Sequence, residues 1–203
     1  MSLNQLKPNP QTVTINGCQY TLVAFYYPDR NTAWDNLFQG QFLTNFYPCT
    51  INMTINAISA SFHNAEAAFQ ATKWWNNPAD LSAFEAAKTG SDAFHIKKQL
   101  ANPDNSYAEL GRDGAMKTVL TQKFSDPAFQ QALLATGDAY LLEHKDADKN
   151  PDSYWSDYND GSGLNMLGKT LMELREALGG SPMPTGNFSV ADFTAQVKKL
   201  VGI

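Results

Sequence analysis

The stretch NAEAAFQATKWW, residues 64–75, predicts a buried helix that carries a polar stripe. Its apolar side chains are spread all round a 3.6-residue helix, which is typical of a helix in a protein core. The polar residues Glu66, Gln70 and Lys73 follow each other at i, i+4 and i+7 and therefore share one face. Because such groups are rarely buried unless they are paired, we interpret the stripe as the wall of a polar pocket. The alternative is the solvated edge of an ordinary amphipathic helix.

The start of this helix bears on the charge of its glutamate. Asn64 is a good N-cap residue, so Glu66 falls in the first helical turn. The helix dipole favours the ionised form of a carboxyl group there. An ionised Glu66 suits a base, a nucleophile or a stabiliser of positive charge.

Length and composition predict a globular protein of one domain, residues 1–203. The chain has 43% hydrophobic and 17% charged residues, and its net charge of −5 argues against nonspecific binding along a nucleic acid. Two cysteines imply no disulfide framework, and three scattered histidines offer no metal-binding spacing. The sequence shows neither an apolar leader nor a membrane-spanning run. We therefore expect a cytoplasmic protein with no metal and no membrane partner, while the oligomeric state stays open.

Secondary-structure signals predict a mainly α (α+β) fold with a small N-terminal β-hairpin. Asn16-Gly17 lies between alternating runs in residues 12–23 and is a strong hairpin signal. A loop is expected up to Gly40, and residues 42–46 and 51–62 are irregular or strand-like. Residues 140–144 favour a short strand. Periodicity and caps predict helices over 65–75, from Pro78 to before Gly90, and over 91–101, 112–124, 127–137, 164–178 and 189–201.

A second candidate site is the polar stretch YWSDYNDGSGLNMLG, residues 154–168. Trp155 suits stacking on a flat group such as a base. Gly161 and Gly163 precede a predicted helix, whose N-terminus could bind an anion; the alternative is a flexible loop. Arg112, between two glycines, is either a phosphate clamp or a solvated charge.

Taken together, these segments resemble the YbiA-like family within the NADAR superfamily of NAD- and ADP-ribose-linked proteins. The resemblance covers residues 22–178, implies a YbiA-like orthogonal helical domain, and leaves a hairpin extension at 1–21 and a helical extension at 181–203. It rests on the ordered motifs FYYPDR, GQFLTNFYP, FHNAEAAFQATKWW, LGRDG, LTQKF, LLEH, YWSDYNDGSGLNMLG and TLMELREAL.

The resemblance implies a set of site residues. The family's acidic residue and lysine fall on Glu66 and Lys73, and its loop motif places Trp155, Asp157 and Asn165 in the site. The remaining matched positions are Asn45, Phe46, Gln70 and Arg112. Two matches are imperfect, since Ala65 and Ser156 stand where the family has Ser and Gly. A basic segment common in the family after the Gly-Arg-Asp motif is also missing here.

The family's chemistry implies an N-glycosidase, a hydrolase that cleaves the bond between C1 of a (phospho)ribose and a base. Ribosylaminopyrimidine intermediates of riboflavin synthesis are the expected substrates. The alternatives are an ADP-ribosyl-guanine glycohydrolase, or a module that binds ADP-ribose or a nucleotide without turnover. The implied partner is a small phosphoribosyl or ADP-ribosyl compound, with nucleic acid only as a modified substrate and no cofactor.

The chemistry of such a reaction assigns roles to these residues. Positive charge develops on the ribose as the bond stretches, and carboxylates such as Glu66 and Asp157 stabilise it or activate water. Lys73 could instead form a Schiff base, which requires a lowered pKa; burial beside Trp74 or Trp75 would lower it, and Glu66 would oppose this. The remaining roles are base stacking and ribose binding, expected for Trp155, Asn45 and Asn165. Trp155 and Asp157 would point into one pocket if their segment is extended.

Overall fold

The computed structural model describes residues 6–28, 31–147 and 152–203. Parts of the predicted N-terminal extension, of the FYYPDR motif and of the loop after Lys145 lie outside the described residues. The chain divides into two compact units. The first unit comprises Met1–Thr44 and Pro127–Ile203, and the second comprises Asn45–Asp126. The predicted family boundaries at residues 22 and 178 stay predictions.

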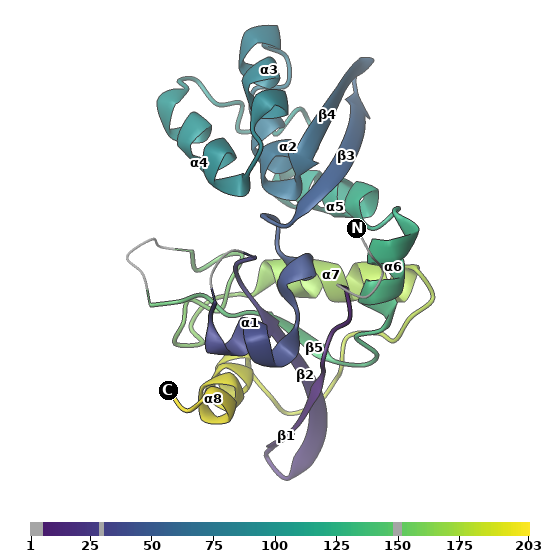
Figure 1. The fold of residues 1–203 in the computed structure, drawn as a ribbon, viewed down its shortest axis with the longest axis vertical. Helices are drawn as coiled ribbons and strands as arrows, with labels where there is room; N and C mark the ends of the chain where they lie inside the picture. Colours follow the sequence, from purple (N-terminus) through teal and green to yellow (C-terminus); the bar gives the residue numbers. More distant parts are fainter. Residues whose placement is uncertain (1–5, 29–30, 148–151) are drawn as a thin grey trace. The chain divides into compact units, whose positions relative to one another are not determined.

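The first unit contains a three-stranded sheet in the order β1-β2-β5 (Figure 1). Strands β1 (Gln11–Ile15) and β2 (Cys18–Phe25) form the antiparallel hairpin that the sequence predicts, and β5 (Tyr140–Glu143) pairs parallel to β2. Asn16 and Gly17 both have positive φ, 51° and 80°, as a two-residue hairpin turn requires. The predicted N-terminal hairpin is confirmed.

Three helices contact this sheet and bury its parallel pair: α1 (Ala33–Phe38), α7 (Met166–Ala177) and α8 (Val190–Val201). Helix α6 (Pro127–Leu134) and the 3-10 turn η2 (Gln41–Leu43) belong to the same unit. Helix α7 contacts β5, and α8 contacts β1, β5 and α1. Strand residues 22–25 and 141–142 are fully buried, as expected for parallel strands with both faces covered.

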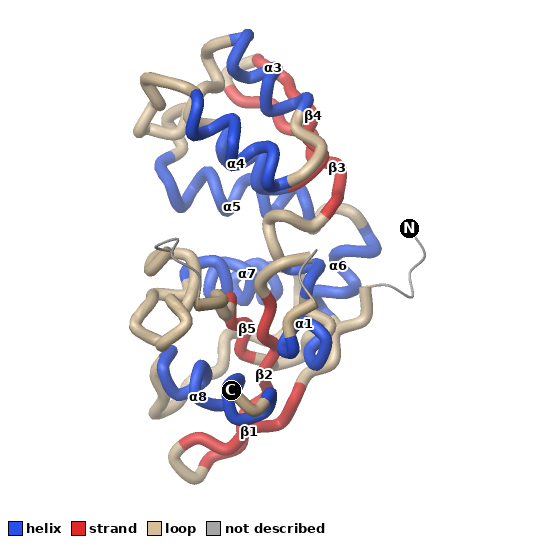
Figure 2. Tube along the Cα trace, turned by 60° about the vertical axis from the view of Figure 1, so that its left-hand side comes forward, coloured by secondary structure: helices blue, strands red, loops and turns tan. Residues whose placement is uncertain are grey.

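The second unit is organised around helix α2 (Ala65–Ala71). This helix, labelled in Figure 1, contacts the hairpin of β3 (Pro48–Ile55) and β4 (Ile58–Asn64) and three helices. Figure 2 shows the hairpin together with these three helices. The three helices are α3 (Pro78–Ala86), α4 (Gly90–Gln99) and α5 (Gly111–Lys123). All seven residues of α2 are buried, as the all-round apolar pattern predicts.

The mainly helical α+β prediction is confirmed, and helices α3 to α8 begin within two residues of their predicted starts. The predicted caps at Asn64 and Asn77 are also present, since their side chains accept hydrogen bonds from backbone N–H groups at the starts of α2 and α3. Ser189 in addition forms a reciprocal capping box with Asp192 at the start of α8. No helix in the described part of the chain is long and apolar enough to span a membrane.

Two sequence predictions are wrong in detail, while residues 51–62, expected to be irregular or strand-like, are strands. Helix α1 lies where a loop was expected, because Thr32 caps it by accepting from the Asp35 N–H. Residues 51–62 form a hairpin whose turn, Asn56-Ala57, lacks the usual glycine. Helix α2 ends at Ala71 rather than at residue 75, since the following N–H groups, such as that of Lys73, bond three residues back.

Candidate functional site

The polar stripe, which begins on α2 and ends in the turn after it, is a continuous chain of hydrogen bonds. The Lys73 Nζ donates to Gln70 Oε1 at 3.0 Å, and Gln70 Nε2 donates to Glu66 Oε1 at 2.8 Å. The helix start is fixed by Asn64, whose Oδ1 accepts from the Ala67 N–H at 2.8 Å. The three residues predicted to share one face are therefore in direct contact, and Gln70 links the Glu66 carboxylate to the Lys73 amine.

Burial distinguishes this stripe from a solvated helix edge. Glu66 is 8% exposed and Gln70 is 4% exposed, while Lys73 is half-buried. The Lys73 Nζ lies 5.7 Å from the Phe69 ring centroid and 5.1 Å from that of Tyr107. A carboxylate, an amide and an amine are thus held in a partly apolar setting, so the alternative of an ordinary surface edge is wrong.

The environment of Lys73 makes its amine easier to deprotonate. Burial lowers the pKa of Lys73 from 10.5 to about 8; the nearby positive charge of Lys97 acts in the same direction, and Glu66 opposes both. The aromatic neighbours are Phe69 and Tyr107 rather than the expected tryptophans. Trp74 and Trp75 are buried and donate their indole N–H groups to backbone carbonyls.

A cavity of about 500 Å³ opens beside Lys73 in the same unit. It is bordered by Lys73 and by residues 74–77 and 99–102, together with Asp80 and Asp104. Its volume falls within the range of small-molecule sites in proteins. The cavity reaches Lys73, whereas Glu66 and Gln70 are not among the residues that line it.

Asn45 and Phe46 lie close to the stripe. The Asn45 carbonyl accepts from the Glu66 N–H at 2.9 Å, which places Asn45 next to the first turn of α2. Its side-chain Nδ2 contacts Met116 Sδ at 3.4 Å, while its buried Oδ1 finds no donor among the described residues. Such an unsatisfied buried acceptor is unusual and suits a ligand hydroxyl. The Phe46 ring packs against Gly90, where an added Cβ would come within 2.4 Å of it.

Arg112 lies in the first turn of α5, in the same unit as the stripe. Its side chain is 45% exposed, and its Nε lies 3.6 Å from Asp113 Oδ1. This contact with a neighbouring carboxylate agrees with the interpretation of a solvated charge. A role in clamping phosphate stays a prediction.

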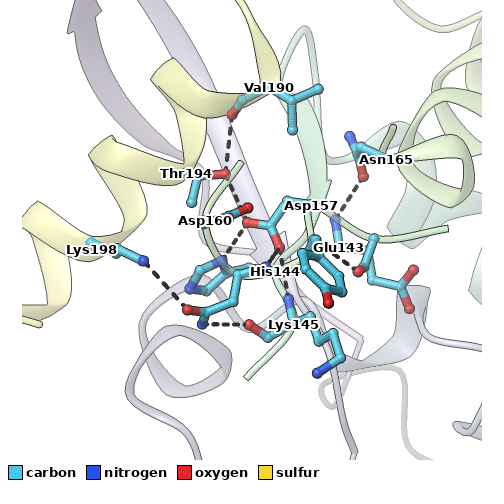
Figure 3. A network of polar contacts seen from close by, with 12 residues as sticks. Glu143, His144, Lys145, Asp157, Asp160, Asn165, Val190, Thr194 and Lys198 are labelled. Atoms are coloured by element: carbon cyan, nitrogen blue, oxygen red, sulfur yellow. Dashed lines mark hydrogen bonds and ion pairs between the residues drawn. The ribbon is translucent and has the colours of Figure 1, made fainter. Parts of the chain in front are cut away.

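The second group of predicted residues surrounds Asp157 in the first unit. Asp157 is fully buried, and Figure 3 shows its carboxylate at the centre of a polar network. His144 Nδ1 lies 2.6 Å from Oδ2, which also accepts from the Thr194 hydroxyl at 2.8 Å. The N–H groups of Lys145 and Asn159 donate to Oδ1 at 3.0 and 2.9 Å.

This geometry favours a positioning role for Asp157. Both carboxylate oxygens are occupied by protein donors, so neither faces a sugar. The segment 152–161 forms turns rather than an extended strand, and the expectation that Trp155 and Asp157 point the same way therefore finds no support. Trp155 is half-buried and packs edge-on against Tyr154, with ring centroids 4.9 Å apart.

Asn165 is the residue before α7 and has a left-handed backbone, φ 51°. Its Oδ1 accepts from the Glu143 N–H at 3.0 Å, and its Nδ2 donates to the Leu141 carbonyl at 2.8 Å. The side chain thus ties β5 to the start of α7 and is fully buried. These contacts leave it poorly placed to bind ribose, the role expected from the sequence.

The start of α7 gives no support to the expected anion site. Three of its N–H groups already donate to carbonyls: Asn165 to Ser156, Met166 to Tyr154 and Leu167 to Trp155. Occupied donors at a helix N-terminus disfavour phosphate binding there. The glycines serve close packing instead, since a Cβ at Gly163 would lie 2.2 Å from the Ser156 carbonyl oxygen.

Sequence reasoning missed His144, which the structure places against Asp157. Its ring is fully buried and lies edge-on to Trp34, with centroids 4.6 Å apart. The signal was present in EHKD, residues 143–146, which directly follow a buried strand. The carboxyl ends of parallel strands are frequent places for functional groups. No cluster of three or more metal-ligating side chains occurs within the described residues.

Comparison with known proteins gives the family of this chain. The NADAR domain model matches residues 31–179, well over half of the sequence. The protein belongs to the NADAR domain family. The matched range includes all nine predicted site residues but ends before α8.

Proteins similar to this NADAR chain are named for riboflavin biosynthesis or for N-glycosidase activity. A riboflavin biosynthesis protein of Vibrio vulnificus is 31% identical over 157 residues, which are 77% of this chain and 38% of that protein. N-glycosidase YbiA of Escherichia coli is 38% identical over 98 residues, 48% of this chain and 54% of that protein. The chain thus matches about two fifths to one half of the length of these relatives.

The fold is shared with a solved structure. The NMR structure of the E. coli protein YbiA aligns with a TM-score of 0.60 at 23% identity, covering 86% of this chain and 92% of that chain. The YbiA-like α+β fold expected from the sequence is therefore confirmed.

Proposed function

We propose that this NADAR protein is an N-glycosidase that hydrolyses the bond between C1 of a (phospho)ribose and a base. The observation that carries the proposal is the buried chain from Glu66 through Gln70 to Lys73, in which a carboxylate is joined to an amine of lowered pKa. Strongly perturbed pKa values are frequent at catalytic sites. The names of the relatives, N-glycosidase and riboflavin biosynthesis protein, support the same reaction class.

In this proposal Glu66 is the general acid and base. It lies in the first turn of α2, where the helix dipole stabilises a carboxylate. The carboxylate would stabilise the positive charge that develops on the ribose as the C1–N bond breaks, and would activate the attacking water. Asn45, whose side-chain oxygen lacks a donor beside Glu66, would accept a hydrogen bond from a ribose hydroxyl.

Lys73 would provide a covalent route. Ring opening of an N-ribosylamine gives an imine at C1, to which the neutral Lys73 Nζ adds. The two Nζ protons pass to the leaving nitrogen, one on addition and one on departure, so the base leaves as its free amine and a Schiff base between Lys73 and C1 remains. Water adds to this Schiff base and releases the sugar, so that the lysine is regenerated. Gln70 holds both groups through its two hydrogen bonds.

Ribosylaminopyrimidine phosphates are the substrates we propose, and Trp155 the side chain that stacks on the base. A small-molecule substrate agrees with the net charge of −5, which disfavours a long nucleic-acid partner. Release of ADP-ribose from modified guanine, and ligand binding without turnover, are the other outcomes that the test below distinguishes. The expected cytoplasmic location stays a prediction.

The test is base release from a panel of ribosylaminopyrimidine phosphates, NAD, ADP-ribose and ADP-ribosylated guanine nucleic acid. Glu66→Gln should keep the fold and lower turnover about 10²–10⁴-fold, the usual contribution of a general acid–base group. Glu173→Gln, at an exposed position of α7, is the matched control and should be as active as the unmodified protein.

Borohydride added during turnover separates the covalent route from direct hydrolysis. It should reduce the Schiff base and leave a sugar adduct on Lys73, which mass spectrometry locates. Full turnover by Lys73→Met would rule the covalent route out. A folded Glu66→Gln variant with undiminished activity, or ligand binding without base release from any substrate, would contradict the glycosidase proposal.

A further inference from the structure

Helix α8 lies beyond the residues that the NADAR domain model matches, yet it is packed firmly into the first unit. The Phe193 ring stacks on Tyr140 of β5 with centroids 4.0 Å apart and an interplanar angle of 2°. Tyr20 and Phe188 meet the same ring edge-on. Phe193 is fully buried. These contacts fix the position of the helix against β5 and the N-terminal hairpin.

One residue after this anchor, Thr194 contacts the carboxylate of the site loop. The buried Thr194 Oγ1 lies 2.8 Å from Asp157 Oδ2 and 3.1 Å from the Val190 carbonyl oxygen. A hydroxyl group has one proton to donate. The carboxylate is the stronger and nearer acceptor, so the proton is directed to Asp157.

This hydrogen bond orients the whole carboxylate. Oδ2 is held between Thr194 and His144, which leaves Oδ1 directed at the N–H groups of Lys145 and Asn159. The Lys145 N–H lies just after β5, and the Asn159 N–H lies in the turn after Asp157. Thr194 and these two backbone groups are therefore linked through one side chain, whose contacts with Thr194, His144 and Lys145 are drawn in Figure 3.

Two further contacts join α8 to the same loop. Lys198 Nζ lies 3.5 Å from Asn159 Oδ1. Gly161 approaches α8 so closely that an added Cβ would lie 2.3 Å from the Ala191 Cα. The loop from residue 152 to residue 163 is thus held by α8 at three points, of which only the Thr194 contact is fully buried.

We propose that α8 is a positioning element of the site and that Thr194 is its positioning residue. By orienting Asp157, Thr194 fixes the turns of residues 152–163, which carry Trp155, the side chain proposed above to stack on the base. This role rests on the N-glycosidase activity proposed above. Thr194 touches no substrate and acts only through Asp157.

The test compares Thr194→Val, which keeps the shape and removes the hydroxyl, with Thr194→Ser, which keeps the hydroxyl. Thr170→Val is the matched control, because the Thr170 hydroxyl donates only to the Met166 carbonyl of its own helix. Measurements are kcat and KM for base release, unfolding by urea, and hydrogen exchange of the Lys145 and Asn159 amides.

We expect Thr194→Val to lower kcat/KM about 10- to 100-fold, the scale on which small misplacements act. Exchange of the Lys145 and Asn159 amides should be about tenfold faster or more. Thr194→Ser should restore both readouts, and Thr170→Val should change neither. Lys198→Met, which breaks only the outer contact, should give a smaller change in the same direction. This variant also tests the proposal if Thr194→Val does not fold.

The proposal is overturned if Thr194→Val matches Thr170→Val in both kcat/KM and amide exchange. Faster exchange with unchanged kcat/KM would also overturn it, since the loop would then move without affecting catalysis. If the unmodified protein releases no base from any substrate, the glycosidase proposal fails. Amide exchange would then still decide whether α8 holds the loop.

Discussion

The lowered pKa of Lys73 gives a quantitative prediction. With a pKa of about 8, roughly one tenth of the amine is neutral at pH 7, whereas a lysine at 10.5 has only about one part in 3,000 neutral. The site therefore raises the concentration of the nucleophilic form about 300-fold. Labelling of Lys73 by an amine-specific reagent should rise with pH and level off above about 8.

Two substitutions should move this pKa in opposite directions. Glu66→Gln removes the carboxylate that favours the charged amine, so the pKa of Lys73 should fall further. Lys97→Met removes a like charge that disfavours the ammonium form, so the pKa should rise. Because burial is the largest cause of the shift, neither variant should return the pKa to 10.5.

The assay is competitive reductive methylation over a pH series, with each lysine quantified by mass spectrometry. The exposed Lys117 of α5 is the internal reference. The reasoning is refuted if Lys73 titrates near 10.5. It is equally refuted if Glu66→Gln and Lys97→Met shift its pKa in the same direction.

Two more predictions concern stability. Asp157→Asn should lower the free energy of unfolding by about 3 kcal/mol or more, because one buried group accepts from four donors and an amide cannot replace it; equal urea midpoints for variant and unmodified protein would contradict this. Lys123 is 1% exposed, and burial lowers its pKa to about 8. The pKa of Lys123 in the folded protein lies below the unfolded value of 10.5, so burial of the charged amine lowers the free energy of unfolding. This cost is fully present below about pH 8. Lys123→Met should therefore gain stability relative to the unmodified protein at pH 7, and this gain should shrink by roughly 3 kcal/mol as pH rises from about 8 toward 10.5. A difference in unfolding free energy that is constant with pH would count against it.

Local features of the fold could be predicted from the sequence. The Asn16-Gly17 turn and the caps at Asn64 and Asn77 depend on neighbouring residues, and all three are present. The second hairpin was missed because its Asn56-Ala57 turn carries no glycine signal. Helix α2 was predicted too long because composition does not show where the hydrogen bonds change from four to three residues back.

The candidate site residues also divide into those that the sequence placed and those whose role depended on the fold. The sequence by itself placed Glu66, Gln70 and Lys73 in line, since helical spacing makes them neighbours whatever surrounds them. The role of Asp157 was decided by tertiary structure, because two of its donors, His144 and Thr194, are 13 and 37 residues away. The pKa of Lys73 likewise depends on burial, which is a property of the packed molecule. Side-chain spacing is fixed along the chain, whereas solvation and distant partners exist only once the chain is folded.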